Sequence, residues 1–343
     1  MKFFYLLLTV TDMNDKLKTV RALGLTSGGL DSILAALILR DQDIAVEWIA
    51  FETPFFPADN AKKAARATGI PITVQNITPQ YLEMLRNPPC GYGQNMNPCM
   101  DCHALMARIA GEIMHREHFD FMFSGEVMGQ RPMSQVQHAL RYVEKRSGVD
   151  GYLLRPLSAH ALAETIPEKE GLVDRTRLYG ITGRSRKQQM ELAAHYGVTD
   201  YPSPAGGCLL TDKGFSKRLK DLFAHQSDCS GSELEALKFG RHFRLSPQCK
   251  LIVGRNKTDN ERLMGTYDAE TMTVLKTENF PGPTCLLTGT PDESALMLAA
   301  GVCAGYSKAP DDDTVQVTVT TGGHKRAITM LSIPHANVKH LLI

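Results

Sequence analysis

A serine- and glycine-rich segment, residues 27–32, stands between a short apolar run and a helical stretch. Its two glycines let the backbone approach an anion, and the N–H groups of a helix start favour negative charge. A carboxylate in such a loop can hold magnesium beside phosphates, and no lysine closes the segment as in a Walker-type loop. An ordinary strand-to-helix turn is the alternative. The nucleotide-binding residues predicted here are Ser27, Gly28, Gly29, Asp31 and Ser32, with Asp31 as the magnesium ligand.

Three cysteines form a second group that could do chemistry. Cys99 and Cys102 are three residues apart, at a turn expected to lead into a helix, and Cys208 follows two glycines. Three thiols can ligate a four-iron, four-sulfur (4Fe-4S) cluster and leave one iron open. A redox dithiol requires only Cys99 and Cys102, whereas a zinc site requires a second cysteine pair. A single cysteine is typically a small, buried apolar residue. Three motif thiols favour the cluster over a persulfide mechanism, which stays open.

The elements around these residues alternate in type. Strand-like segments at 20–25, 44–51, 72–77 and 119–124 are interleaved with helix-like segments at 33–40, 60–68 and 104–118. This alternation predicts an α/β fold with a doubly wound parallel sheet. Ligands of such sheets bind beyond the carboxyl ends of the strands. The loops after Leu25, Phe51 and Phe123 are therefore expected to face one site.

A Pro/Gly-rich stretch at 200–207 separates this region from a different pattern. Strand-like segments at 249–254 and 314–320, with a helical segment at 293–306, predict a smaller α+β domain. We expect an N-terminal extension at 1–19, a nucleotide domain at 20–212 and a second domain at 213–343. Apolar residues 3–10 predict a strand, because the run is too short to span a membrane, and Met13 is an alternative start.

The composition describes a globular protein of two or three domains, with 343 residues, 43% of them hydrophobic, and a net charge of +1. Residues 213–262 hold eleven basic and six acidic residues. A phosphate-binding face and a solvated surface explain this local excess equally well. Eight scattered cysteines without an export signal favour a reducing cytoplasm and no membrane association.

Residues 27–32 resemble the pyrophosphate loop of the ATP pyrophosphatase (PP-loop) family, whose fold the resemblance implies for 20–212. Members cleave ATP between the α and β phosphates and pass AMP to a substrate oxygen. The cysteine pair resembles that of the 2-thiouridine synthetases. Residues 124–135 are similar to the 4-thiouridine synthetases, in which this segment lies beside the nucleotide, and imply nucleotide contacts from Gly125 and Gln130.

The basic segment 183–188 also resembles the tRNA-thiolating branch of that family, and it implies that Lys187 neutralises pyrophosphate or RNA phosphate. A solvated helix start is the alternative. We interpret His103, beside Cys102, as a surface residue. Bacterial 4-thiouridine synthetases typically carry a long RNA-binding region before the loop, and many end in a rhodanese domain; neither pattern is visible, so tRNA binding must fall elsewhere.

Residues 250–263 supply the candidate, because they resemble the Val-Gly-Arg-Asn signature of the NFACT-R domain, which is associated with tRNA and ribosome binding. The resemblance implies RNA contacts from Arg255, Asn256 and Lys257. A tight turn with surface charges is the alternative. Thr284 and Cys285 stand where typical members have a histidine.

Together these features predict an ATP-dependent tRNA sulfurtransferase. It would adenylate a uridine carbonyl, release pyrophosphate and replace the oxygen with sulfur, using Asp31, Cys99 and Cys208 as catalytic residues. The predicted cofactors are ATP, Mg²⁺ and a 4Fe-4S cluster on Cys99, Cys102 and Cys208. The partners would be tRNA and a sulfide or persulfide donor, with a homodimer left open. Two alternatives remain: sulfur insertion into a small cofactor precursor, and a non-catalytic RNA- or ribosome-binding factor with a vestigial nucleotide site.

Overall fold

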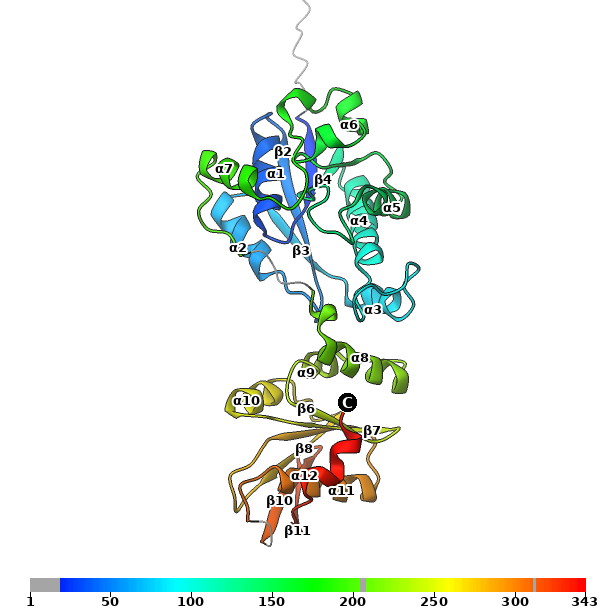
Figure 1. Ribbon diagram of the computed structural model, residues 1–343, viewed down its shortest axis with the longest axis vertical. Coiled ribbons are helices and arrows are strands. Elements are labelled where there is room, and N and C mark those ends of the chain that lie inside the picture. Colours follow the sequence, from blue (N-terminus) through cyan, green and yellow to red (C-terminus); the bar gives the residue numbers. More distant parts are fainter. Residues whose placement is uncertain (1–18, 204–207, 311–312) are drawn as a thin grey trace, which may run out of the picture. The chain divides into compact units, whose positions relative to one another are not determined.

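The computed structural model describes residues 19–203, 208–310 and 313–343. The strand expected at 3–10, the alternative start at Met13 and the glycines before Cys208 lie outside these residues. The described chain forms two compact units (Figure 1). No helix within them has the length and apolar character needed to cross a membrane.

The first unit is built on a parallel five-stranded sheet flanked by helices (Figure 1). β1 pairs in parallel with β2 and β4, and β4 pairs in parallel with β5. The order β3-β2-β1-β4-β5 confirms the doubly wound sheet predicted from the alternation. The strands are β1 (Arg21–Leu25), β2 (Ala45–Glu52), β3 (Ile72–Asn76), β4 (Phe121–Ser124) and β5 (Leu153–Leu154).

The first core lies between this sheet and helix α1, whose sequence LDSILAALILR is apolar on nearly every side. Trp48, Phe121 and Phe123 pack with the buried residues of α1. Burial on several sides explains why this helix lacks a polar face. The other helices of the unit are α2 (Asp59–Thr68), α4 (Cys99–Arg116), α5 (Gln137–Ser147), α6 (Ile166–Lys169) and α7 (Lys187–His195), with α1 spanning Leu30–Arg40 and 3₁₀ turns η1 (Ala159–Ala161) and η2 (Arg175–Arg177).

Helix α4 begins earlier than the sequence predicts. Its apolar spacing is clear only from residue 104, but the helix starts at Cys99. Both cysteines of the pair therefore lie in its first turns rather than in a turn before it. Asn97 precedes the helix and donates a hydrogen bond from Nδ2 to the Cys99 Sγ at 2.9 Å.

The second unit contains a six-stranded antiparallel sheet in the order β11-β10-β8-β9-β7-β6. It also takes in residues 52–57 and 77–99 together with the described chain after 207. The strands are β6 (Arg241–Ser246), β7 (Cys249–Val253), β8 (Met272–Thr277), β9 (Cys285–Gly289), β10 (Thr314–Thr321) and β11 (His324–Leu331). The helices are α3 (Thr78–Arg86), α8 (Lys213–His225), α9 (Gly231–Ala236), α10 (Lys257–Gly265), α11 (Glu293–Gly305) and α12 (His335–Val338), with 3₁₀ turns η3 (Leu209–Thr211) and η4 (Lys339–Leu341).

Successive residues of β7 serve two cores on opposite faces of this sheet. Leu251 and Val253 pack with the buried residues of α11, whereas Ile252 packs with Ala236 and Leu263 of α9 and α10. All five residues of β7 are consequently buried. A strand covered on both faces is apolar along its length, and β7 follows this pattern except at Lys250, which is why the sequence predicted it almost to the residue.

Backbone hydrogen bonds tie the approach to Cys99 to the segment after Cys208. The Met96 N–H donates to the Leu210 carbonyl at 3.2 Å, and the Asn95 side-chain amide donates to the Thr211 carbonyl at 2.6 Å. Within the second unit, the two chain segments that carry Cys99 and Cys208 thus lie side by side.

Candidate functional site

The glycine loop follows β1 and leads directly into α1. Gly28 has a φ of +74°, and a Cβ there would lie 2.2 Å from the Asn60 backbone. The position therefore needs glycine both for its conformation and for space. The Gly28 N–H donates to the Thr26 hydroxyl at 3.0 Å, and the Ser32 hydroxyl donates to the Gly29 carbonyl at 2.8 Å. These bonds fix the loop, while Ser27 stays exposed at its tip.

The loop after β4 packs on the start of α1. A Cβ on Gly125 would lie 2.4 Å from the Asp31 carbonyl carbon and the Ser32 nitrogen, so only glycine allows this approach. The Gln130 side-chain amide donates to Asp31 Oδ2 at 3.0 Å. The structure thus brings Gly125 and Gln130 together with the glycine loop. The place is the carboxyl edge between β1 and β4, where the strand order reverses and such sheets bind ligands.

Asp31 is the central titratable group of this edge. Burial raises the pKa of its carboxyl above the usual range, although the hydrogen bond from Gln130 opposes that shift. Asp31 Oδ1 and Gln130 Oε1 are both buried without a hydrogen-bond partner among the described residues. Two acceptor oxygens that lack donors suit a hard cation. One or two protein oxygens are the usual protein contribution to a magnesium ion that also binds phosphates, so these residues fit Mg²⁺.

The predicted phosphate contact Lys187 and its neighbour Arg186 differ in their surroundings. Lys187 begins α7, its side chain is 83% exposed, and Nζ lies 4.0 Å from the Glu191 carboxylate. Arg186 instead acts electrostatically on Asp31, and its Nε is buried without a partner among the described residues. The preceding loop is held by the Gly183 N–H, which donates to the Met128 carbonyl at 2.8 Å. Arg131 also acts electrostatically on Asp31. Of the two cations, Arg186 has the buried nitrogen without a partner among the described residues, which makes it a candidate phosphate contact.

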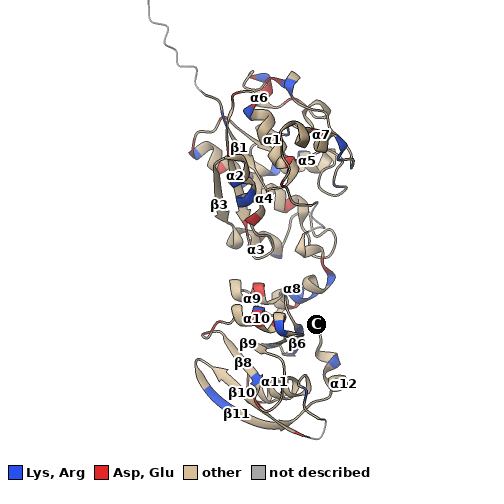
Figure 2. Cartoon of the chain, turned by 90° about the vertical axis from the view of Figure 1, so that its left-hand side faces the viewer, with Lys and Arg blue, Asp and Glu red and all other residues tan. Residues whose placement is uncertain are grey.

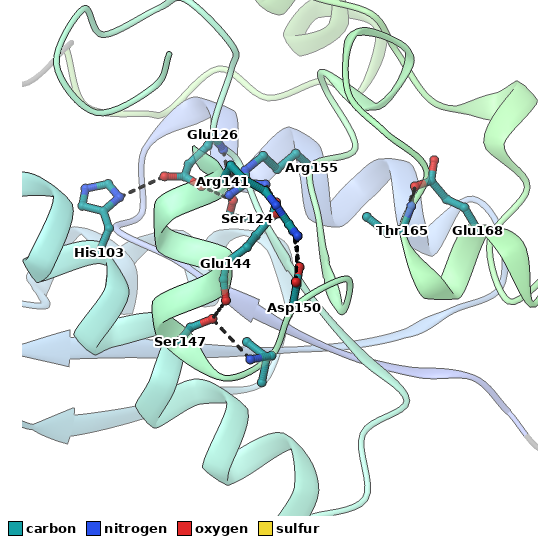
Figure 3. A network of polar contacts seen from close by, with 11 residues as sticks. His103, Ser124, Glu126, Arg141, Glu144, Ser147, Asp150, Arg155, Thr165 and Glu168 are labelled. Atoms are coloured by element: carbon teal, nitrogen blue, oxygen red, sulfur yellow. Dashed lines mark hydrogen bonds and ion pairs between the residues drawn. The ribbon is translucent and has the colours of Figure 1, made fainter. Parts of the chain in front are cut away.

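A buried network of charges follows β4 and β5 (Figure 3). Arg155 is 2% exposed, and its Nε donates to Glu126 Oε2 at 3.0 Å. Its Nη1 pairs with Glu144, which also binds Arg141 of the same helix. No motif in the sequence pointed to Arg155 or Glu144, because their partners come from separate segments.

Glu126 joins this network to the start of α4. Its Oε1 lies 2.9 Å from His103 Nδ1, so His103 is not the unattached surface residue expected from the sequence (Figure 3). Burial alone would raise the pKa of Glu126, but the Arg155 guanidinium and the His103 ring hold it at about 2. The carboxylate is therefore ionised throughout the neutral range.

The three cysteines of the predicted cluster do not form a metal site in the described residues, which contain no group of three His, Cys, Asp or Glu side chains able to hold a metal ion. Cys99 and Cys102 lie on α4 and Cys208 precedes η3. The geometry does not support the predicted 4Fe-4S cluster, and we derive no chemical step through one.

The Gly254–Asn260 turn, which carries the predicted RNA contacts, is engaged in holding the second unit together. Asn256 Oδ1 accepts the Asp259 N–H at 2.9 Å and caps α10. Arg255 Nε donates to the same Asp259 at 2.6 Å. Asn260 Oδ1 accepts the Thr284 N–H at 3.1 Å. A Cβ on Gly254 would collide with this same Oδ1 atom of the Asn260 side chain. Of the three predicted contacts, Lys257 alone has a side chain that is 91% exposed.

Residues 240–341 match the family described as the NFACT protein RNA binding domain, which confirms the resemblance seen in the turn. No curated protein matches the chain. Three solved structures have partial similarity to the chain. A predicted subunit of tRNA methyltransferase from Methanocaldococcus jannaschii has 16% identity and a TM-score of 0.38, over 61% of this chain and 89% of that one.

A 4-thiouridine synthetase–RNA complex with bound ATP has 18% identity and a TM-score of 0.33, over 52% of each chain. The C-terminal part of a fibronectin/fibrinogen-binding protein from Streptococcus suis has 14% identity and a TM-score of 0.27, over 71% of this chain and 94% of that one.

We expect Glu126→Gln to destabilise the protein at pH 7 by about 3 kcal/mol, because it leaves the Arg155 charge buried with one partner fewer. Glu126 has a lowered pKa, so its contribution is present above the unfolded-state value of 4.5 and is lost as pH falls towards 2. Denaturant unfolding from pH 7 to pH 3 should therefore show a shallower acid loss in the variant. Equal acid slopes would contradict the assignment.

Asn256→Ala should lower the free energy of unfolding by about 1 kcal/mol, because it removes the cap of α10. Lys257→Ala, one residue on and exposed, is the matched control and should leave stability unchanged. Denaturant titration of both variants measures the difference. An Asn256→Ala variant as stable as the control would show that the cap contributes nothing.

Proposed function

We propose that the chain is an ATP-dependent tRNA sulfurtransferase, which adenylates a uridine carbonyl of tRNA and replaces its oxygen with sulfur. The observation that carries the proposal is the arrangement at the carboxyl edge of β1 and β4. There a glycine loop, a buried carboxylate with an unpartnered oxygen and a buried guanidinium nitrogen without a partner meet. Such a set suits a nucleotide triphosphate with its magnesium ion.

In the activation step, the backbone of the loop after β1 would cradle the phosphates of ATP. Asp31 and Gln130 would hold Mg²⁺, which neutralises phosphate charge and activates the α-phosphorus when bound. Arg186 would stabilise the charge that develops on pyrophosphate as it departs. The uridine oxygen forms a bond to the α-phosphorus, and the bond to the bridging oxygen of pyrophosphate breaks.

In the sulfur step, a sulfur nucleophile attacks the adenylated carbon, and AMP leaves with the former carbonyl oxygen. We propose that Cys99 and Cys208 serve this step, because their segments lie side by side in the second unit. One thiol would carry a persulfide whose outer sulfur bonds to the carbon. The second thiol would then attack the carrier sulfur, which closes a disulfide and leaves the outer sulfur on the carbon as the thiocarbonyl. A thiol reductant would reopen the disulfide before the next turnover.

The acceptor is proposed from the second unit. Residues 240–341 are similar to a family described as RNA-binding, which favours tRNA over a small cofactor precursor. We further propose that 20–212 acts as the nucleotide domain and 213–343 as the RNA-binding domain. A persulfide donor would transfer its outer sulfur to the carrier thiol, whereas sulfide could act directly only in the alternative cluster mechanism.

The test combines the protein with tRNA, MgATP, a persulfide donor and a thiol reductant. It measures thiouridine by nucleoside mass spectrometry, and AMP and pyrophosphate as released products. Wild type should form all three products, and Asp31→Asn should lower their rates at least about a hundredfold. Glu191→Gln, on the exposed side of α7, is the control. AMP without thiouridine would overturn sulfur transfer but keep the ATP chemistry. An Asp31→Asn variant as active as wild type would overturn the site.

Iron content and absorbance distinguish the two sulfur mechanisms, because both mechanisms require Cys99 and Cys208. Replacing Cys99 or Cys208 with Ser should stop thiouridine formation. A protein purified without oxygen that holds stoichiometric iron and absorbs broadly near about 400 nm would assign the step to a 4Fe-4S cluster on Cys99, Cys102 and Cys208 instead.

Two neighbouring cations give a sharper test of the nucleotide site. Arg186→Ala should weaken MgATP binding by about tenfold, roughly the 1.4 kcal/mol of one charge-assisted contact. Lys187→Ala removes the next positive charge along the chain but an exposed one, and should change affinity less than about twofold. Isothermal titration with MgATP measures both. The reverse order of effects would restore Lys187 as the phosphate ligand.

A further inference from the structure

Helix α8 presents an exposed row of lysines, and these form no ion pair with the residues that the structure describes. It carries four basic residues and one acidic residue. Its apolar face, Phe215, Leu219 and Leu222, is buried. Lys213, Lys217 and Lys220 recur at intervals of four and three residues on the opposite face, and all three are exposed. We call these three residues the α8 lysine row. Figure 2 colours the basic residues of the chain blue and labels α8.

The positions of these lysines reduce the stability of α8 itself. Lys213 is the first residue of α8, where the positive end of the helix dipole disfavours a cation. Lys213 and Lys217 are like charges one turn apart, a spacing that destabilises a helix. A surface chosen only for stability would place acidic residues here.

Nearby acidic groups are already engaged. Asp221 pairs with Arg244 and lies near His225, and Asp212 accepts the Phe215 N–H as the helix cap. The positive charge also extends from α8 towards α10. Arg218 of α8 lies close enough to Arg255 for their charges to interact, and Arg255 is half-exposed.

We propose that the α8 lysine row binds the phosphate backbone of the RNA. The row precedes residue 240, so it lies outside the part of the chain that is similar to the RNA-binding family. It deepens, and rests on, the proposed tRNA-directed function. Three ammonium groups on one side of a helix, about 6 and 4.5 Å apart along its axis, match a linear polyanion better than a compact acidic ligand.

The experiment uses the full chain and a tRNA transcript. The triple variant Lys213→Gln/Lys217→Gln/Lys220→Gln should bind the transcript about tenfold more weakly at about 100 mM salt. The slope of log affinity against log salt should fall by roughly two, because about three phosphate contacts are lost. Its melting temperature should match or exceed that of wild type, because the change removes repulsion and buries nothing.

The matched control is Lys276→Gln/Lys308→Gln/Lys325→Gln, which removes the same charge from exposed positions elsewhere in the second unit. It should change affinity less than about twofold. Equal losses in both variants would attribute binding to net charge and overturn the row. Comparable binding of poly-glutamate by wild type, abolished in the row variant, would overturn RNA as the partner.

Failure of this inference is distinguishable from failure of the proposed function. If the row variant binds tRNA as wild type does while thiouridine still forms, the row is refuted and the function stands. If wild type forms no thiouridine but the row variant alone loses tRNA affinity, the surface stands and the chemistry falls.

Discussion

The first unit depends on the close approach of the β4 loop to the start of α1. Gly125 lies against the Asp31 and Ser32 backbone with no room for a Cβ. That approach sets the position of Gln130, whose amide orients the Asp31 carboxylate. It also requires β1 and β4 to be neighbours, which the strand order provides. The absence of a Cβ at Gly125 thus determines the place at which a phosphate and a cation could bind together.

The buried charges behind that edge serve a different purpose. Glu126, Glu144 and Arg155 are costly to remove from water, and their mutual pairing offsets the cost without a large net gain in stability. What they provide is a fixed geometry, since each carboxylate accepts a guanidinium from another segment. His103 is drawn into the same network, so the start of α4 is aligned with the end of β4.

Much of the architecture was predictable, because buried strands and apolar helices leave strong periodic signals. The sequence also predicted that Gly125 and Gln130 lie beside the glycine loop, and the structure has this arrangement. It predicted Lys187 as the phosphate contact, and this stays a prediction; the electrostatic interaction with Asp31 instead comes from Arg186, one position earlier, because a shift of one residue changes the direction of a side chain at the start of a helix. It missed Arg155 because a buried ion pair between distant segments has no local pattern. It predicted a 4Fe-4S cluster that the described residues do not support, because the spacing of cysteines along a chain does not fix their distances between helices and loops.

The recognisable motif in the Gly254–Asn260 turn consists largely of residues that stabilise the turn itself. Asn256, Asp259 and Asn260 all use their side chains on neighbouring backbone or on Arg255. Residues committed to holding their own domain together cannot change without cost, whereas exposed lysines can. The residues that maintain the fold are therefore different from the exposed residues that could contact a partner. A domain of this kind can keep its recognisable turn while the charges on its exposed surface change.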